Sequence, residues 1–218
     1  MNYLAHGFRV VDDPDRVAGT ALPDWIAACD RRARLRRERL DDSFPALRAG
    51  VEQHWEEDAR FHGSEAFQTL EAELTSRIRE AHRDHPRLRA WFLGHILVEM
   101  LLDAQVIVEG QGRLDDYYRA LERVDVRKVV AAAGRWATRK PVHLGPYIEG
   151  FRRSRFLYGY VDDAGLFARL CRVAERVGLP PLPPTILPLL PGARRLVAAR
   201  MDDLLPDATR TPAPRPSR

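Results

Sequence analysis

Two segments of the chain carry imidazoles and carboxylates at the same unusual spacing. At positions i, i+4 and i+8 the chain holds first His54, Asp58 and His62, and then His95, Glu99 and Asp103. Because successive residues of an α-helix turn by about 100°, this spacing places each set in one narrow stripe along one helix face. The pattern therefore predicts two helices that display the side chains by which proteins bind divalent metal ions.

The second stripe lies in a strongly apolar segment, residues 91–108, WFLGHILVEMLLDAQVIV. Burying an imidazole and two carboxylates costs several kcal/mol unless something pairs with them. A metal ion shared by two facing helices would provide this pairing, with up to six ligands for one octahedral ion or a two-metal cluster. Two alternatives need no metal. The first stripe taken alone fits an exposed polar face, and the second fits a buried polar network between helices.

Helical patterns dominate the rest of the chain, and no segment shows sustained period-two alternation. We therefore predict an all-α fold, with one helical domain over residues 1–205 and a disordered tail over 206–218. The expected helices cover residues 14–21, 24–40, 45–62, 65–84, 85–110, 113–124, 126–139, 146–160, 164–177 and 192–205. The proline-rich segment 180–191 is expected to run as extended chain without regular structure.

Charge and composition narrow the range of partners. The net charge of +4 is carried largely by arginine, and residues 31–39 hold six arginines in nine positions. Such a run suits an acidic partner, whereas no aromatic residues interleave it as a binder of single-stranded nucleic acid would need. The N-terminus lacks the pattern of a signal peptide, and charged residues interrupt the 91–108 run, so we expect a cytoplasmic protein without a membrane helix.

Two residues near the N-terminus could join the stripes. His6 lies in the apolar opening NYLAHGF, and Asp24 follows Pro23 at an expected helix start. For each of them alone, a buried structural histidine or a helix N-cap is a sufficient explanation.

Three short motifs resemble a known family. They are the opening MNYLAH, then AGTALPDW around Asp24, then AGVEQHWEEDARFH. They resemble the acyl carrier protein phosphodiesterases, which read approximately MNFLAH, GNxxADF and GIxxHRxIDxxTD. The family positions are matched by His6, Gly19, Asp24, Gly50, His54 and Asp58. His62 stands where the family has a second aspartate, and the family's DHFL finds only GHIL at 94–97.

The resemblance covers about the first half of the chain and implies a fold and a chemistry. The family is similar to the HD-type phosphohydrolases, all-helical bundles in which histidine and aspartate hold a divalent cation, often manganese. It implies a metal-dependent phosphodiester hydrolase, with holo-acyl carrier protein as substrate and release of 4′-phosphopantetheine. Manganese is the expected metal, with iron, magnesium and zinc as alternatives.

The residues then take the following roles. The predicted metal ligands are His6, Asp24, His54, Asp58, His62, His95, Glu99 and Asp103. Asp58 or Glu99 would act as general base beside a metal-activated water. Arg152, Arg153 and Arg155 could hold a phosphate, although a solvated helix face would also explain them.

Two rival functions belong to other classes. The first is a non-catalytic helical binding module in which the stripes form a structural network. The second is a di-metal oxidase, but such bundles favour Glu-x-x-His pairs and the sequence contains none.

Overall fold

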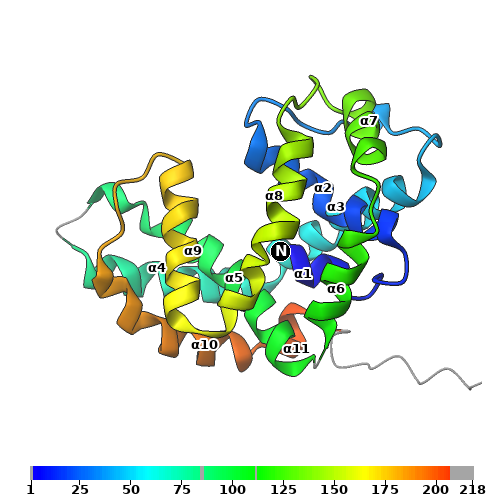
Figure 1. Ribbon diagram of the computed structural model, residues 1–218. Helices are drawn as coiled ribbons and strands as arrows, with labels where there is room; N and C mark the ends of the chain where they lie inside the picture. The colour runs from blue at the N-terminus through cyan, green and yellow to red at the C-terminus, as the bar shows by residue number, and fades with distance from the viewer. Residues whose placement is uncertain (1, 84–85, 111, 207–218) are drawn as a thin grey trace, which may run out of the picture.

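The computed structural model describes residues 2–83, 86–110 and 112–206. These residues form α-helices and short 3-10 turns, and contain no β-strand beyond one isolated bridge between Leu35 and Ala137. The predicted all-α fold is therefore confirmed. The helices are α1 Tyr3–Gly7, α2 Pro14–Cys29, α3 Pro45–Gly63, α4 Glu65–Ala81, α5 Ala90–Glu109, α6 Arg113–Glu122, α7 Val126–Trp136, α8 Leu144–Ser154, α9 Asp163–Arg176, α10 Leu190–Ala198 and α11 Met201–Leu204 (Figure 1). The predicted tail lies largely outside the described residues.

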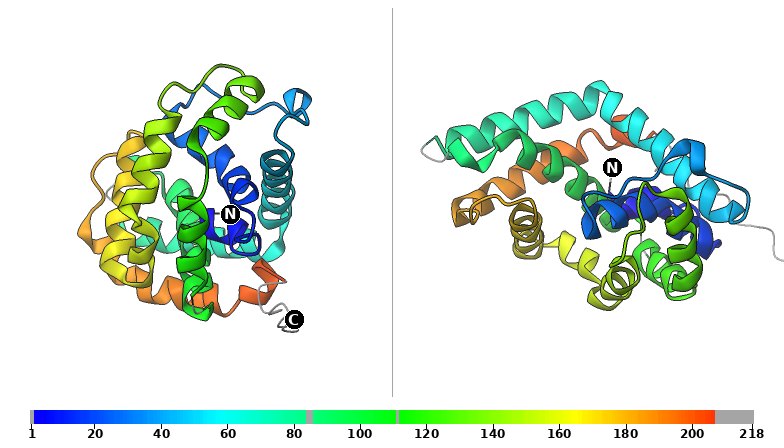
Figure 2. Two further views of the ribbon diagram at one scale, coloured as in Figure 1. Left: turned by 45° about the vertical axis from the view of Figure 1, so that its right-hand side comes forward. Right: turned by 90° about the horizontal axis from the view of Figure 1, so that it is seen from above.

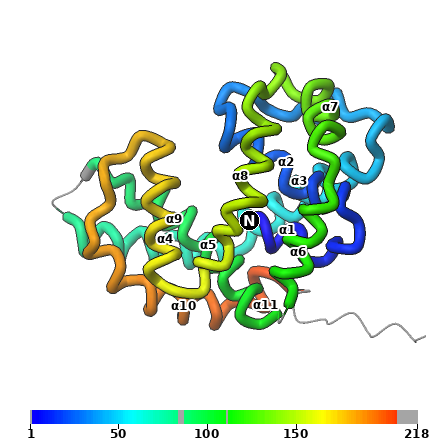
Figure 3. Tube along the Cα trace, in the orientation of Figure 1, coloured from blue at the N-terminus to red at the C-terminus, as the bar shows by residue number. Residues whose placement is uncertain are grey.

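The short N-terminal helix, α1, lies at the centre of the molecule (Figures 1 and 2). In Figure 3, α4, α9 and α10 gather on one side of it, and α2, α3, α6, α7 and α8 on the other. All five residues of α1 are buried. A helix of this length is not stable alone, so its position depends on the surrounding helices.

Two polar side chains hold the beginning of α1. Asn2 accepts a hydrogen bond from the backbone N–H of Tyr3. Asp103 of α5 accepts hydrogen bonds from the backbone N–H groups of Leu4 (3.2 Å) and Ala5 (2.8 Å). These N–H groups have no acceptor inside the helix, so the carboxylate fixes the end of α1 against α5.

Helices α2 and α3 cross at a contact between two glycines. A Cβ atom on Gly50 would lie 2.3 Å from the backbone oxygen of Arg16 and 2.7 Å from the Cα atom of Gly19. A Cβ atom on Gly19 would lie 2.2 Å from the backbone oxygen of Leu47. The two backbones can approach this closely only because both positions lack a side chain.

Helix α5 contains the apolar segment and packs against α4. By length and composition it could cross a membrane, but 56% of its most apolar window is buried within the molecule. This burial is consistent with the core helix of a soluble protein. Ser64 ends α3 and caps α4 by accepting a hydrogen bond from the N–H of Phe67, so the predicted break between α3 and α4 is confirmed.

The prediction of two helices at 14–21 and 24–40 is wrong. A single helix, α2, continues through Pro23 and ends at Cys29. Pro23 removes only one backbone hydrogen bond, and burial of the flanking residues Leu22, Trp25 and Ile26 compensates for it.

The arginine-rich segment 31–39 is therefore not helical apart from one 3-10 turn, Arg37–Arg39. It runs along the end of α7, where Arg36 donates its N–H to the oxygen of Trp136 (3.0 Å) and Thr138 donates its N–H to the oxygen of Arg34 (2.8 Å). We call residues 31–39 the arginine strap.

Three boundaries further along the chain also differ from prediction. A 3-10 turn, Pro86–Leu88, and the left-handed residue Arg89 precede α5, which begins only at Ala90. The segment 146–160 divides into α8 and a 3-10 helix, Phe156–Val161. The proline-rich segment is more regular than predicted, because Pro184–Leu189 forms a 3-10 helix and α10 begins at Leu190. Proline at the first positions of a helix costs no hydrogen bond, which allows this.

Candidate metal centre

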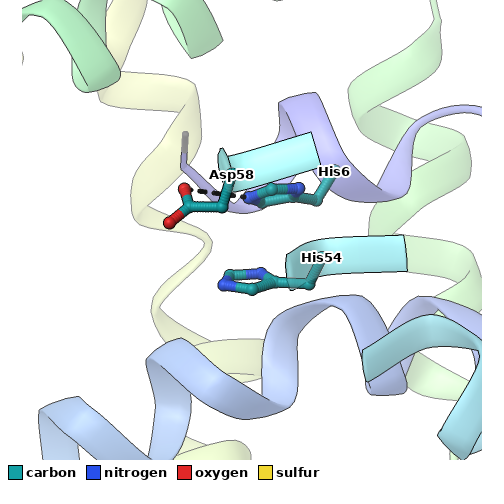
Figure 4. Close-up of side chains that lie close together, drawn as sticks. All are labelled: His6, His54 and Asp58. Atoms are coloured by element: carbon teal, nitrogen blue, oxygen red, sulfur yellow. Dashed lines mark ion pairs between the residues drawn. The ribbon is translucent and has the colours of Figure 1, made fainter. Parts of the chain in front are cut away.

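A first group of potential ligands joins α1 to α3. The group consists of His6, His54 and Asp58. Each of these residues has one potential ligand atom that lies within 4.8 Å of those of the other two. Figure 4 shows the two imidazole rings one above the other, with the Asp58 carboxylate beside them. The ring centroids are 4.1 Å apart, and Nε2 of His6 lies 4.0 Å from Oδ1 of Asp58. We call these three residues the α1–α3 set.

A second group joins the end of α3 to α5. It consists of His62, His95 and Glu99, whose ligand atoms also lie within 4.8 Å of one another. The Glu99 carboxylate lies 3.1 Å from Nε2 of His62 and 3.4 Å from Nε2 of His95. The two rings stack with centroids 4.9 Å apart. We call these residues the α3–α5 set.

The two sets adjoin at Asp58. Its second carboxylate oxygen, Oδ2, lies 3.3 Å from Nδ1 of His62. Matched spacing predicts that His54, Asp58, His95 and Glu99 converge on one point, but the structure divides them between the two sets. The helix rise separates the two ends of the α3 stripe by about 12 Å, so that His54 meets His6 of α1 whereas His62 meets His95 and Glu99 of α5.

Each of the four histidines is held by a hydrogen bond from Nδ1. His6 donates to the Glu57 carboxylate and His95 to the Glu71 carboxylate, each at 2.8 Å. His54 donates to the backbone oxygen of Thr20 (2.8 Å), and His62 to the backbone oxygen of Asp58 (3.0 Å). Every ring therefore keeps Nε2 for the centre of its set. Metal-binding histidines are held in this way, with a carboxylate or carbonyl on the other nitrogen.

The sequence did not identify these partners. Glu57 lies three residues after His54 and so on the same side of α3, but its charged neighbours indicate an exposed polar face. It is buried, because α1 covers it. Glu71 and the carbonyl of Thr20 come from α4 and α2, and no spacing in the sequence links them to the histidines.

The α1–α3 set favours neutral imidazoles. Burial and the neighbouring His54 ring lower the pKa of His6 well below its ordinary value. Burial lowers the pKa of His54 to about 4. Nε2 of His6 is buried and has no hydrogen-bond partner among the described residues. An unpaired buried acceptor is costly, and a metal ion would satisfy it.

The α3–α5 set favours charged imidazoles. Burial opposes protonation of His62, but its hydrogen bonds with Asp58 and Glu99 outweigh this and raise its pKa to about 9. The hydrogen bond with Glu99 raises the pKa of His95 as well. Burial raises the pKa of Glu99, but the opposing causes, among them the hydrogen bonds with His62 and His95, lower it to about 2. Without a metal, this set forms an ion-pair network together with the carboxylates of Asp58 and Glu71.

Two predicted ligands lie outside both sets. Asp103 is fully buried and uses both oxygens on the N–H groups at the start of α1, so it positions His6 rather than facing an ion. Asp24 lines a cavity together with Asp58 and Glu99. Burial raises the pKa of Asp24 to about 8, and the charges of Glu99 and Asp58 contribute to this.

That cavity has a volume of about 320 Å³ and opens beside both sets. Besides the three carboxylates it is lined by Arg31, Arg169 and Arg176, and by apolar residues of α5 and α9. Arg31 belongs to the arginine strap, which therefore reaches the site at this residue. Arg169 and Arg176 were not predicted, although their spacing of seven residues on one helix face is visible in the sequence.

The three arginines predicted to hold phosphate lie elsewhere. Arg152, Arg153 and Arg155 line a separate hollow with Glu122 and Glu149. Arg152 pairs with Glu149 (3.2 Å), and Arg155 pairs with Glu122 (2.5 Å). Both of these charges are neutralised locally, and the structure does not bring the three arginines to the candidate metal centre.

No family model matches the sequence, and neither a curated protein nor a solved structure matches it. The resemblance to the acyl carrier protein phosphodiesterases therefore stays a prediction, and function is inferred from the residues of the site.

Proposed function

We propose that this protein is a metal-dependent phosphoester hydrolase whose centre is formed by the α1–α3 and α3–α5 sets. The orientation of the four histidines carries the proposal. Each ring donates from Nδ1 to a carboxylate or carbonyl. Nε2 of His6 then lies 4.0 Å from Asp58, and Nε2 of His62 and of His95 lie 3.1 Å and 3.4 Å from Glu99. The buried Nε2 of His6 has no hydrogen-bond partner among the described residues, and a bound cation would give it one.

The donor atoms suit a catalytic ion. Each set offers two imidazoles and one carboxylate, a combination used for hydrolytic zinc and for iron(II), and it leaves positions for water and substrate. A bound divalent ion would lower the pKa of a coordinated water and neutralise charge on a phosphoryl oxygen. The mixed nitrogen and oxygen donors are compatible with manganese, iron or zinc.

The cavity residues favour a phosphoester over other substrates. Arg169 lies over the Phe156 ring, with the guanidinium carbon 3.6 Å from the ring centroid, which fixes its plane. A fixed guanidinium suits a phosphoryl group, since two parallel N–H groups can each donate to one oxygen. Asp24, Asp58 and Glu99 supply carboxylates on the same cavity, of which Asp58 and Glu99 remain the proposed general bases.

Metal content and turnover test the proposal. Purified protein should bind divalent metal stoichiometrically, and a screen of small phosphomonoesters and phosphodiesters should find hydrolysis that chelator abolishes and manganese, iron or zinc restores. The rival structural network predicts no stoichiometric metal and an unchanged melting temperature in chelator. Protein that binds metal but consumes oxygen instead of hydrolysing phosphoesters would point to the di-metal oxidase.

The finer proposal concerns the natural substrate. The motif resemblance implies holo-acyl carrier protein, with hydrolysis of the phosphodiester between its serine and 4′-phosphopantetheine, in an HD-type bundle. The arginine strap supports an acidic partner, because Arg31 lines the cavity and Arg32, Arg34, Arg36, Arg37 and Arg39 continue from it as exposed side chains.

A further inference from the structure

The cavity beside the candidate metal centre has two ends, an inner and an outer level, which are lined by chemically different groups. Three segments each contribute two lining residues that are seven positions apart. These pairs are Asp24 of α2 with Arg31 just beyond the end of α2, Phe92 with Glu99 on α5, and Arg169 with Arg176 on α9. On a helix, seven residues are about two turns, or about 10 Å along its axis. The cavity is therefore long enough to hold more than a single phosphoryl group.

The inner level contains Asp24, Glu99 and Arg169. Glu99 belongs to the α3–α5 set, and its charge acts on Asp24. Asp24 and Arg169 line the cavity together with Tyr3 of α1. This level provides the candidate metal centre and a guanidinium for the reacting phosphoryl group.

The outer level contains Arg31, Arg176 and Phe92. Arg31 is exposed, and Arg176 is half-buried. In the described part of the chain neither arginine forms an ion pair with a carboxylate, whereas Arg152, Arg155 and Arg194 all do. Two cavity arginines without a carboxylate partner are available to an anionic ligand.

The walls between the two levels are apolar. They are formed by Ala27 and Ala28 of α2, Ile96 of α5 and Val173 of α9. These side chains offer no hydrogen bonds, so the part of a ligand that crosses them gains most from being apolar itself.

We infer that the substrate is a phosphoester with a second anionic group about 10 Å from the reacting phosphorus, bound by Arg31 and Arg176, with an apolar connection between the two. The assignment of the reacting group rests on the proposed function. The outer anion site concerns ligand binding and does not require hydrolysis. The hydrolase and the outer site can therefore be tested separately.

Titration calorimetry with non-hydrolysable probes tests the inference on the full chain loaded with Mn²⁺. Hexane-bisphosphonate, which has a phosphonate at each end of an apolar chain, is compared with hexylphosphonate, which has only one. We expect the bisphosphonate to bind about tenfold more tightly, as one additional charge-assisted hydrogen bond would give. Ethane-bisphosphonate is too short to span two helical turns and should gain nothing. A blank titration into Mn²⁺ buffer corrects for chelation.

Variants test whether Arg31 and Arg176 cause the tighter binding of hexane-bisphosphonate. The double variant Arg31→Met and Arg176→Met keeps much of the apolar stem and should bring both hexyl probes to equal affinity, without weakening hexylphosphonate. The matched control is Arg172→Met, since Arg172 is an exposed arginine on the same helix as Arg176. It should retain the tenfold difference.

Three results would overturn the inference: equal binding of the two hexyl probes to the unchanged protein, an equal gain for ethane-bisphosphonate, or an equal loss for both hexyl probes in the double variant. Metal-dependent hydrolysis of small phosphodiesters without any preference for hexane-bisphosphonate would refute the outer site and leave the hydrolase standing. Protein that prefers hexane-bisphosphonate through Arg31 and Arg176 but hydrolyses no phosphoester would refute the hydrolase and leave the outer site standing.

Discussion

At the residue scale, the α1–α3 set and the α3–α5 set differ in the protonation that their surroundings favour. Burial lowers the pKa of His6 and His54, whereas carboxylate partners raise the pKa of His62 to about 9 and raise that of His95 as well. A metal ion binds only the neutral imidazole, so near neutral pH its binding must displace a proton from His62, whereas His6 and His54 have none to release.

The pH dependence of metal binding follows from this difference. The pKa of His62 is about 9 in the metal-free protein, so metal affinity at the α3–α5 set should rise as the pH rises towards 9. At the α1–α3 set the histidines impose no such dependence above about pH 5, because the pKa of His54 is about 4. Calorimetry at pH 7 in buffers of different ionisation enthalpy should detect proton release in the variant His54→Ala, which keeps the second set. Equal proton release in the variant His95→Ala, which keeps the first, would contradict the prediction.

The same shift affects stability in the absence of metal. Because the pKa of folded His62 is raised above its unfolded value of about 6.5, its ion pairs stabilise the fold fully below that pH. This contribution is lost as the pH rises to about 9 and beyond. Metal-free protein should therefore show a falling melting temperature over this range, and the variant His62→Gln should show a smaller decrease.

Removing one ligand from either set should abolish turnover and keep the fold. We expect Asp58→Asn and His95→Ala to reduce hydrolysis of the wild-type substrate to background, because each removes a donor of the centre. Circular dichroism should stay close to wild type, since apolar packing holds α3 and α5. The control is Glu56→Gln on an exposed position of α3, which should retain activity. Full turnover in both ligand variants would contradict the catalytic assignment.

Asp103 should affect stability rather than metal binding. The variant Asp103→Asn can still accept one of the two N–H groups at the start of α1 but presents an amide to the other, at a cost of about 1–3 kcal/mol. Urea unfolding should reveal this cost. The number of metal ions bound by the folded variant should match that of the wild type. Loss of one ion would contradict this prediction and indicate that Asp103 is a metal ligand.

At the element scale, the crossing of α2 and α3 places His54 against the backbone of α2. The Gly19–Gly50 contact brings the helices close enough for Nδ1 of His54 to reach the oxygen of Thr20 at 2.8 Å. The glycines therefore position His54, a proposed metal ligand that lies one turn away from Gly50.

A methyl group at this crossing should separate the helices. In Gly50→Ala the new Cβ atom would meet the backbone oxygen of Arg16, and backbone cannot move aside as a flexible side chain can. We expect a loss of about 3 kcal/mol in the free energy of unfolding, together with weaker metal binding. The control is Gly134→Ala in α7, where a Cβ atom would meet nothing within 4 Å, and where alanine should stabilise the helix by up to about 1 kcal/mol. Similar stabilities for the two variants would contradict this role of the crossing.

At the scale of the whole molecule, the arginine strap connects the cavity to the surface of the neighbouring α7. An acidic carrier that docks on the strap would bring its phosphodiester towards the metal centre. Exposed charges are screened beyond about 8–10 Å at physiological ionic strength, so such docking should weaken with salt. Hydrolysis of holo-acyl carrier protein should accordingly require divalent metal and slow at high salt.

Charge reversal in the strap tests this docking. Arg34, Arg36 and Arg37 are exposed, and their combined replacement with Glu should impair hydrolysis of the carrier while small phosphodiesters are cleaved as before. As a control, the reversal of Arg36 and Arg37 is compared with that of Arg195 and Arg200, two exposed arginines outside the strap, and the latter should have a much smaller effect. If the metal-loaded protein cleaves small phosphodiesters but leaves the carrier intact, the proposed hydrolase activity stands and the proposed carrier substrate is refuted.

Periodicity within the sequence determined which residues share a helix face. The spacing of four in His54, Asp58 and His62, and again in His95 and Glu99, predicted α3, α5 and five of the six residues of the two sets. This succeeded because the helix repeat is local and does not depend on the rest of the chain. The imidazoles and carboxylates likewise indicate metal chemistry by themselves, because the kind of donor atom is a property of the residue type.

The tertiary structure decided which faces meet. It placed His6 beside His54 and Asp58, separated the predicted ligands into two sets, and assigned Asp103 to the start of α1. It also brought Glu71 and Arg169 to the site from helices that no sequence spacing connects to the stripes. The helix repeat does not reveal which other helix packs against each face. That choice is set by burial and by close contacts between segments far apart in the chain, such as the contact of Gly19 with Gly50.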